Sequence, residues 1–400
     1  MRPAQVIGAG ISGLAAAWHL ADRGFAVTVV DRSPGPGGLI NTIQTDHGPV
    51  ETAANAFVWD EVVSSWFRRL DLTPVFPEPV SKRRYIFRRG RPRRWPLGAG
   101  ASLAMAGRLA TAALTRSTTA REDETIAAWG DRVLGASARE WLVEPAMQGI
   151  YASPARELSA RAIFDGRKRG SRRLAAPAGG MGQFTSRLHE RLADRGVRFS
   201  FNTEIDRLDP SVATVIATPA TSAAQLIAPH APVLAGRISA IRIAPLVTVT
   251  MFFAPHVDDV RGFGVLFPYA SGVRALGALF NTDIFAGRGT VRSETWIVGD
   301  RDMGMTDWAD DRLREALTGD RQLLTGRRDT PLAVHVTRWH QAIPVYDHAI
   351  IALKKELPAL PAWLALAGNY LGTIGVAGLL ARADSASARL AAGTSTVTTS

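Results

Sequence analysis

The sequence predicts an α/β protein: a Rossmann-like, open parallel sheet that binds a dinucleotide, joined to a β-rich domain and a helical insertion. A strand, a glycine turn, a helix and a second strand follow one another over residues 5–30. A second pattern of strand, glycine turn and helix start occupies residues 364–378. Between 197 and 300 apolar and β-branched runs favour strands, whereas much of 57–170 has helical spacing.

Composition limits the classes of protein. The 400 residues are enough for about two to three domains. Hydrophobic residues make up 46% and charged residues 21%, which excludes wholesale disorder. Cysteine is absent, so disulfides, thiolate metal sites and a cysteine nucleophile are excluded, and no His/Asp or His/Glu metal spacing occurs. Because Met1-Arg2-Pro3 lead straight into a structural motif, we expect no signal peptide and a cytoplasmic protein, with membrane association left open.

The N-terminal glycine motif lies between a strand and a helix, as a dinucleotide-binding motif does. Gly8, Gly10 and Gly13 follow a short apolar strand and open a helix, and Asp31 ends the next strand. Gly8 allows a tight turn, Gly10 leaves room for a pyrophosphate, and Gly13 lets helix and strand pack closely. The helix start offers unpaired N–H groups to phosphate, and Asp31 can accept a hydrogen bond from a ribose hydroxyl.

FAD is favoured over NAD by two further glycine-rich pieces. Gly37 and Gly38 follow soon after Asp31, where they let the chain turn over a pyrophosphate. The turn from Gly368 leads into a second helix start, which we expect to face the flavin end of the same cofactor. The residues predicted to contact FAD are Gly8, Gly10, Ile11, Ser12, Gly13, Asp31, Arg32, Gly37, Gly38, Leu39, Gly368, Asn369, Ile374, Gly375 and Val376.

Several motifs resemble the protoporphyrinogen/coproporphyrinogen oxidase branch of the FAD-dependent amine oxidase superfamily, over almost the whole chain. The glycine motifs are shared by the superfamily, whereas the Ala-Ile-Pro and Gly-Asn elements near the C-terminus favour this branch. The segments that carry the resemblance are Gly48–Phe57, Arg84–Phe87 with Trp95-Pro96, Gly149–Ser159, Gly179–Met181, Gly262–Arg288, Trp339–Tyr346 and Gly368–Tyr370.

The resemblance implies a chain that weaves between domains. The expected FAD-binding domain comprises 1–75, 178–228 and 335–400. The expected substrate-binding domain comprises 76–95 and 229–334, and 96–177 form a helical insertion that is a candidate membrane-facing subdomain. By the same resemblance Arg84 binds a substrate carboxylate and Asn55 hydrogen-bonds cofactor or substrate, while Trp339 and Tyr346 are candidates to line the substrate cavity.

A dense basic run, 82–94, holds eight of the cations behind the net charge of +11. Three interpretations remain open for this run: a solvated face, an anionic membrane surface, or recognition of substrate carboxylates by arginine. Nucleic acid is not expected as a partner, because no nucleic-acid-binding module surrounds the basic residues.

The expected function is FAD-dependent removal of hydride from an activated C–H of an apolar, carboxylate-bearing small molecule, by the resemblance a porphyrinogen, with oxygen as acceptor. Residues 240–300 contain no lysine, which disfavours amine oxidation, since amine oxidases commonly place a lysine near the flavin. Alternatives are a specialised-metabolism dehydrogenase, desaturase or amine oxidase on the same fold, and a non-catalytic flavoprotein or partner-binding module. The oligomeric state is left open.

Overall fold

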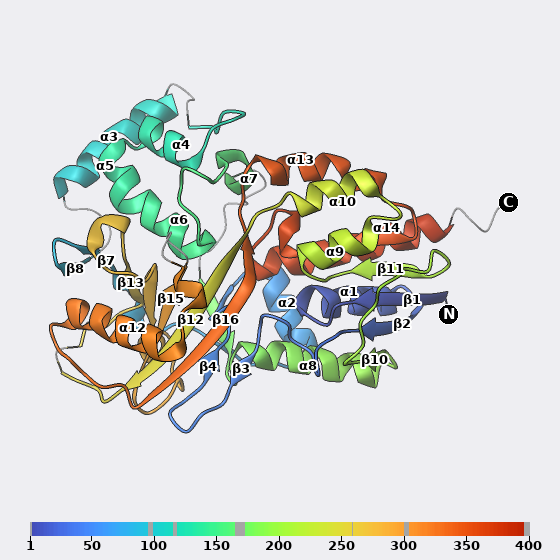
Figure 1. Cartoon of the computed structure of the whole chain (residues 1–400), viewed down its shortest axis with the longest axis horizontal. Helices are drawn as coiled ribbons and strands as arrows, with labels where there is room; N and C mark the ends of the chain where they lie inside the picture. The colour runs from blue at the N-terminus through green and yellow to red at the C-terminus, as the bar shows by residue number, and fades with distance from the viewer. Residues whose placement is uncertain are drawn as a thin grey trace.

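The structure, a computed structural model, describes residues 2–94, 99–114, 118–164, 173–257, 259–299 and 304–395. The chain forms a lobe around a five-stranded parallel sheet, a lobe around a seven-stranded mixed sheet, and a helical insertion beside them (Figure 1). The predicted α/β fold class is confirmed. Trp95 and Pro96, which contributed to the resemblance, lie outside the described residues.

The parallel sheet joins segments from both ends and the middle of the chain. Strand β1 is central and pairs in parallel with β2 on one side and β11 on the other. In sheet order the strands are β10 (Arg198–Ser200), β2 (Phe25–Val30), β1 (Arg2–Ile7), β11 (Ala213–Ile216) and β17 (Leu364–Leu366).

Helices cover both faces of this sheet because its residues alternate between two cores. Val6 and Val215 belong to one core, whereas their neighbours Ile7 and Ile216 belong to the other. The first core is covered by α1 (Ile11–Asp22), α2 (Glu61–Arg69), α8 (Met181–Asp194) and α14 (Val376–Ser395). The second core is covered by α9 (Ala220–Ile227), α10 (Pro232–Ser239) and α13 (His348–Glu356).

The seven-stranded sheet is built around the long antiparallel pair β12 and β16. In order its strands are β16 (Ala333–Pro344), β12 (Ile243–Phe253), β15 (Arg292–Val298), β14 (Gly277–Phe280), β13 (Gly264–Leu266), β7 (Arg84–Arg88) and β8 (Arg91–Arg94). Helix α12 (Asp310–Thr325) covers one face, where Val249, Phe267 and Trp296 form the third core. Short helix α11 (Asn281–Ile284) connects to β15.

The helical insertion packs around its own core. Its helices are α3 (Ala99–Leu114), α4 (Ile126–Val133), α5 (Ala136–Ala138), the π-helical turn η2 (Arg139–Val143), α6 (Glu144–Tyr151) and α7 (Ala160–Phe164). Val345 and Tyr346, just beyond β16, are buried in this core, so the insertion is anchored where the two lobes meet. Two small sheets complete the fold: β3 (Thr42–Ile43) with β4 (Val50–Glu51), and β5 (Phe57–Val58), β9 (Leu174–Pro177) and β6 (Pro74–Val75).

The structure differs from the sequence expectations at several element and domain boundaries. Strand β16 pairs with β12, so the seven-stranded sheet extends into the range 335–400 that we had placed in the FAD-binding domain. Helix α10 packs in the second core of the parallel sheet, although its residues fall in the range 229–334, which we expected in the substrate-binding domain. Helix α14 extends to Ser395, and its apolar residues as far as Leu390 pack in the first core.

A buried network of charges stabilises the seven-stranded lobe. The Glu294 carboxylate is fully buried and accepts hydrogen bonds from Arg292 Nε (2.5 Å), Arg321 Nε (3.1 Å) and Trp296 Nε1 (3.1 Å). Arg321 also pairs with Asp329. These contacts cross from β15 to α12, and each charge depends on the others for its compensation.

We predict that Glu294→Ala lowers the free energy of unfolding by about 3–5 kcal/mol, because Arg292 and Arg321 both lose the buried carboxylate to which they are hydrogen-bonded. Urea denaturation followed by circular dichroism measures the loss. The control is Glu61→Ala, whose exposed pair with Arg68 contributes less than about 1 kcal/mol. Equal losses in the two variants would contradict a structural role for the network.

Candidate active site

The first glycine turn, which connects β1 to α1, is closely packed. Gly8 has φ +107°, and its N–H donates to Val30 O at 2.8 Å. A Cβ on Gly13 would lie 1.8 Å from Gly8 O, so only glycine fits there. Gly10 is the N-cap of α1, and no side chain caps this helix start. The first N–H groups of α1 are therefore available to an anion.

A second glycine turn lies directly against the first. Gly37 donates its N–H to Ala9 O at 2.9 Å and forms a parallel bridge with Gly10. Gly38 has φ +59°, and a Cβ on it would approach Gly10 Cα to 3.2 Å. The two turns thus form a cradle of bare backbone that side chains at these positions would fill.

The acidic residue after β2 braces this cradle. Asp31 accepts hydrogen bonds from the N–H groups of Ala9, at 2.6 Å, and Ser33, at 2.7 Å. Each carboxylate oxygen can accept a further hydrogen bond, so Asp31 can keep these two bonds and also accept one from a ribose hydroxyl. The neighbouring Arg32 is exposed.

The closing turn after β17 lies at the same edge of the parallel sheet as the first glycine turn. Strands β1, β11 and β17 are parallel, so their carboxyl ends and the helices that follow them start from one side. Gly372 in this turn has φ +90°. Asn369 Nδ2 donates to Ala342 O at 3.2 Å, which ties the turn to β16.

Tyr346 is held below the closing turn. Its side chain is 2% exposed, its hydroxyl donates to Asn369 O at 2.8 Å, and its ring packs edge-to-face on Tyr151. Burial raises the pKa of Tyr346 well above its ordinary value, so the hydroxyl stays protonated as a donor. These contacts describe a residue that supports the turn, rather than the cavity-lining residue that the sequence suggested.

Trp339 connects the seven-stranded sheet to the chain around the glycine cradle. Its indole N–H donates to Thr52 O at 2.8 Å, and the Thr248 hydroxyl donates to the same carbonyl at 3.4 Å. The Thr52 hydroxyl in turn donates to Leu39 O at 2.8 Å. Thr52 therefore links two predicted site residues, Trp339 and Leu39, although sequence analysis had not singled it out.

The face of the seven-stranded sheet opposite α12 turns toward the parallel-sheet lobe. Leu279 on this face packs against the first core of that lobe. The register places Arg84, Gly264 and Leu279 side by side in one row of the face. Its apolar residues are half-buried and could contact a ligand: Leu246, Leu266, Leu279, Ile297 and Trp339.

Arg84 is exposed at one side of this face, and its guanidinium lies over the Phe263 ring, 4.7 Å from the centroid. Strands β7 and β16 are separated by four others, so Arg84 and Trp339 lie about 24 Å apart along the sheet. The structure therefore does not bring these two predicted substrate residues together. Asn55 lines a small cavity with Glu51, Asn281 and Arg288.

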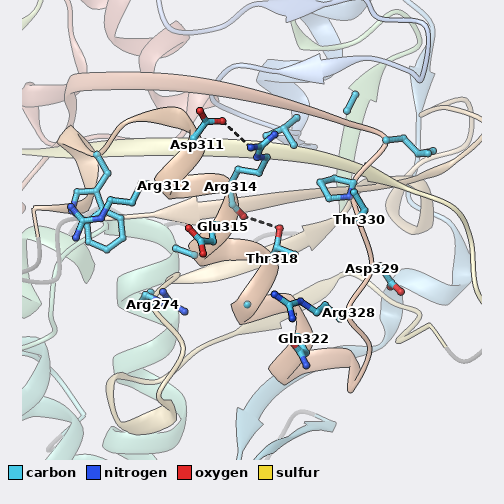
Figure 2. A pocket seen from close by; sticks show the side chains of 17 residues that line it. Arg274, Asp311, Arg312, Arg314, Glu315, Thr318, Gln322, Arg328, Asp329 and Thr330 are labelled. Carbon is cyan, nitrogen blue, oxygen red and sulfur yellow. Dashed lines mark hydrogen bonds and ion pairs between the residues drawn. The ribbon is translucent and has the colours of Figure 1, made fainter.

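A charged groove of about 1160 Å³ lies on the other face of the seven-stranded sheet, between α12 and residues 327–334 (Figure 2). Much of its charge is paired within the chain: Arg314 with Asp311 at 2.9 Å and Arg274 with the buried Asp320 at 3.0 Å. The sheet and its third core separate this groove from the glycine cradle. We do not assign the groove to the active site.

In the part of the chain that the structure describes, no group of three or more histidine and acidic side chains could hold a metal ion. No helix among the described residues is both long enough and apolar enough to cross a bilayer.

The chain belongs to the flavin containing amine oxidoreductase family, whose model matches residues 11–370. It is 25% identical to a coproporphyrinogen III oxidase of Propionibacterium freudenreichii, over 93% of this chain and 87% of that protein. It is also 25% identical to protoporphyrinogen oxidase 2 of Arabidopsis thaliana, over 93% and 90%. The fold is similar to that of cyclohexylamine oxidase from Brevibacterium oxydans: TM-score 0.75, 18% identity, 98% and 99% coverage.

The protein is thus an FAD-dependent oxidoreductase, as its sequence predicted. The cradle of Gly8, Gly10, Gly37 and Gly38 fits this cofactor, because it presents backbone N–H groups and an uncapped helix start without side chains in the way. A fixed amide cradle of this kind suits a pyrophosphate better than a cationic ligand.

We predict that Gly10→Ala weakens FAD binding at least about tenfold while the FAD-free protein still folds. A Cβ on Gly10 meets only Gly38 Cα, at 4.0 Å, so the methyl group occupies the cradle without straining the chain. Fluorescence titration with FAD measures the affinity, and the control is Gly236→Ala on α10, where a Cβ meets nothing within 4 Å. Unchanged FAD affinity in Gly10→Ala would place the pyrophosphate elsewhere.

Proposed function

We propose that the protein oxidises a porphyrinogen to the corresponding porphyrin with dioxygen as acceptor. The observation that carries the proposal is a set of half-buried apolar side chains on this face of the seven-stranded sheet, set among threonines, with the exposed guanidinium of Arg84 at one side. Apolar side chains suit the largely apolar rings of a porphyrinogen, and a guanidinium suits a carboxylate on its rim. The names of the curated relatives support the same substrate class.

The cofactor is proposed to lie along the edge where both glycine-lined helix starts meet. Ile11, Ser12 and Gly13 at the start of α1 would bind the pyrophosphate through their N–H groups, with Arg32 and Leu39 flanking. Asp31 would bind the ribose. Gly368, Asn369, Ile374, Gly375 and Val376 would approach the flavin end at the start of α14.

Bound FAD would supply the redox chemistry: three successive two-electron oxidations of the porphyrinogen, each removing one hydride and one proton, with one dioxygen reduced to hydrogen peroxide each time. The residues of this chain contribute binding and position. Leu266, Leu279 and Ile297 would pack on the macrocycle and exclude water. Thr52, held by Trp339 and Thr248, fixes the distance between the substrate face and the cofactor turn.

Aerobic turnover tests the proposal. Purified protein loaded with FAD is given coproporphyrinogen or protoporphyrinogen, and porphyrin fluorescence and peroxide are recorded against autoxidation and against the Gly10→Ala variant. Porphyrin formation above both controls supports the proposal. No rate above autoxidation with either substrate overturns it, and oxidation of an uncharged apolar compound instead would favour the desaturase or dehydrogenase alternative.

We predict that Arg84→Ala raises KM for the porphyrinogen at least about tenfold with a smaller effect on kcat, because a carboxylate loses a charge-assisted hydrogen bond far from the reacting carbon. Steady-state kinetics provide the measurement. The matched control is Arg94→Ala, since Arg94 lies opposite Tyr85 on the other face of the same hairpin. Equal KM values for wild type and Arg84→Ala would show that Arg84 does not bind a carboxylate of the substrate.

We also propose that the basic hairpin β7–β8 and helix α3 bind the surface of an anionic membrane. Arg89, Arg91, Arg93 and Arg94 are exposed on the hairpin. Leu103 and Leu114 of α3 are 73% and 85% exposed, and no acidic residue lies in this helix. Exposed leucines beside arginines suit a membrane interface with anionic lipid, at about 1 kcal/mol per basic residue.

We predict that the protein sediments with vesicles containing anionic phosphatidylglycerol and not with pure phosphatidylcholine vesicles, and that high salt releases it. Changing Arg91 and Arg93 together to glutamate should reduce the bound fraction at least several-fold, since two attractions become repulsions. Arg237→Glu, at an exposed position of α10, serves as the charge control. Equal loss in the control, or binding that ignores lipid charge, would contradict this surface.

A further inference from the structure

A small polar cavity lies where the two lobes meet. It is bounded on one side by the segment that contains β4 and on the other by α11 and the chain that follows it. The lining residues are Pro49, Glu51, Asn55, Asn281, Ile284, Phe285 and Arg288. The backbones around it are in close contact, since a Cβ on Gly48 would lie 2.8 Å from Arg288 O.

Arg288 carries a buried donor without a partner. Its side chain is only 6% exposed, and its Nη1 pairs with the Glu51 carboxylate. Glu51 is fully engaged, since it also accepts from Met181 N at 2.9 Å and from the Thr42 hydroxyl at 2.6 Å. Arg288 Nη2, by contrast, has no hydrogen-bond partner among the described residues, which is rare for a buried guanidinium nitrogen.

The other polar side chains at the cavity complement this donor. Asn281 Nδ2 gives both its hydrogens to Ser293 Oγ and Thr295 Oγ1, each at 2.9 Å. Its Oδ1 therefore remains as an acceptor, and no described residue donates to it. The Asn55 amide can both donate and accept. A ligand here would accept from Arg288, donate to Asn281 and exchange a hydrogen bond with Asn55.

We propose that this cavity is a binding site for one ordered water molecule that links Asn55 to the Glu51–Arg288 pair. The cavity has room for about one water, and three polar partners surround it. The ligand is neutral, because Glu51 already balances the charge of Arg288 and would repel a second anion.

The proposed water gives Arg288 and Asn281 a positioning role. Asn55 was predicted from the sequence to meet cofactor or substrate, and the water would fix the orientation of its amide. Because Arg288 comes from the seven-stranded lobe and Asn55 from the parallel-sheet lobe, the water also joins the lobes. This inference does not depend on the substrate being a porphyrinogen.

A crystal structure of the FAD-loaded protein, at a resolution that shows ordered water, tests the site. The expected result is one density peak about 2.7–3.2 Å from Arg288 Nη2, Asn281 Oδ1 and the Asn55 amide. A dry cavity, a cavity filled by a side chain or by cofactor atoms, or Arg288 Nη2 bonded to a backbone carbonyl would each overturn it. A crystal soaked in bromide provides a second check, since an anomalous peak in the cavity would show an anion site instead.

The Arg288→Lys variant tests which group holds the water. Lysine keeps a positive charge beside Glu51 but has no donor at the Nη2 position, so its crystal structure should lack the water and show a turned Asn55 amide, with FAD still bound. Arg261→Lys, at the partly exposed pair with Asp283, is the control and should keep the water. Retention of the water in Arg288→Lys would refute the assignment to Arg288. If this variant does not fold, the wild-type crystal structure still shows whether the water is bound.

Discussion

The parallel pairing of β1 with β11, and of β11 with β17, is the constraint on which the site depends. It brings residues from both ends of the chain to one edge of a sheet. There the N-termini of α1 and α14 point to the same region, and a single extended cofactor can meet both. Close contact between the helices maintains this arrangement, since Ser387 of α14 hydrogen-bonds Ala16 O of α1 at 3.1 Å. A change that separated these strands would remove the cofactor site before it touched any residue of the substrate face.

The second requirement is a fixed separation between the glycine cradle and the face of the seven-stranded sheet that we propose to bind substrate. Polar contacts at the centre of the interface accomplish this: Trp339 and Thr248 both donate to Thr52 O, and Arg288 pairs with Glu51. These contacts are buried or half-buried, so breaking one of them costs more free energy than breaking an exposed contact. The helical insertion adds a third connection, because its core includes Val345 and Tyr346 at the end of β16.

Local pattern was enough to predict the parts of the site that are local in sequence. Gly8, Gly10, Gly13 and Asp31 lie on one strand–helix–strand unit, and their spacing reflects the geometry of that unit. Thr52 and Arg288 could not be found in this way, since their partners lie up to 287 residues away and polar residues of their kind occur throughout the chain. Tyr346 was a candidate for the cavity wall, and its own sequence gave no sign of the hydrogen bond by which its hydroxyl supports the Asn369 turn. The domain boundary expected at residue 335 falls inside β16, because the pairing of this strand with β12 has no signature in the strand's own sequence.

The position of β17 in the sheet has a consequence for synthesis of the protein. This strand occupies an edge next to β11, yet it is synthesised long after β11. Until β17 is made, β11 has one side unpaired, and the proposed pocket for the flavin end is incomplete. The sheet therefore depends on slow, long-range pairing, and under our proposal complete binding of FAD follows the synthesis of β17.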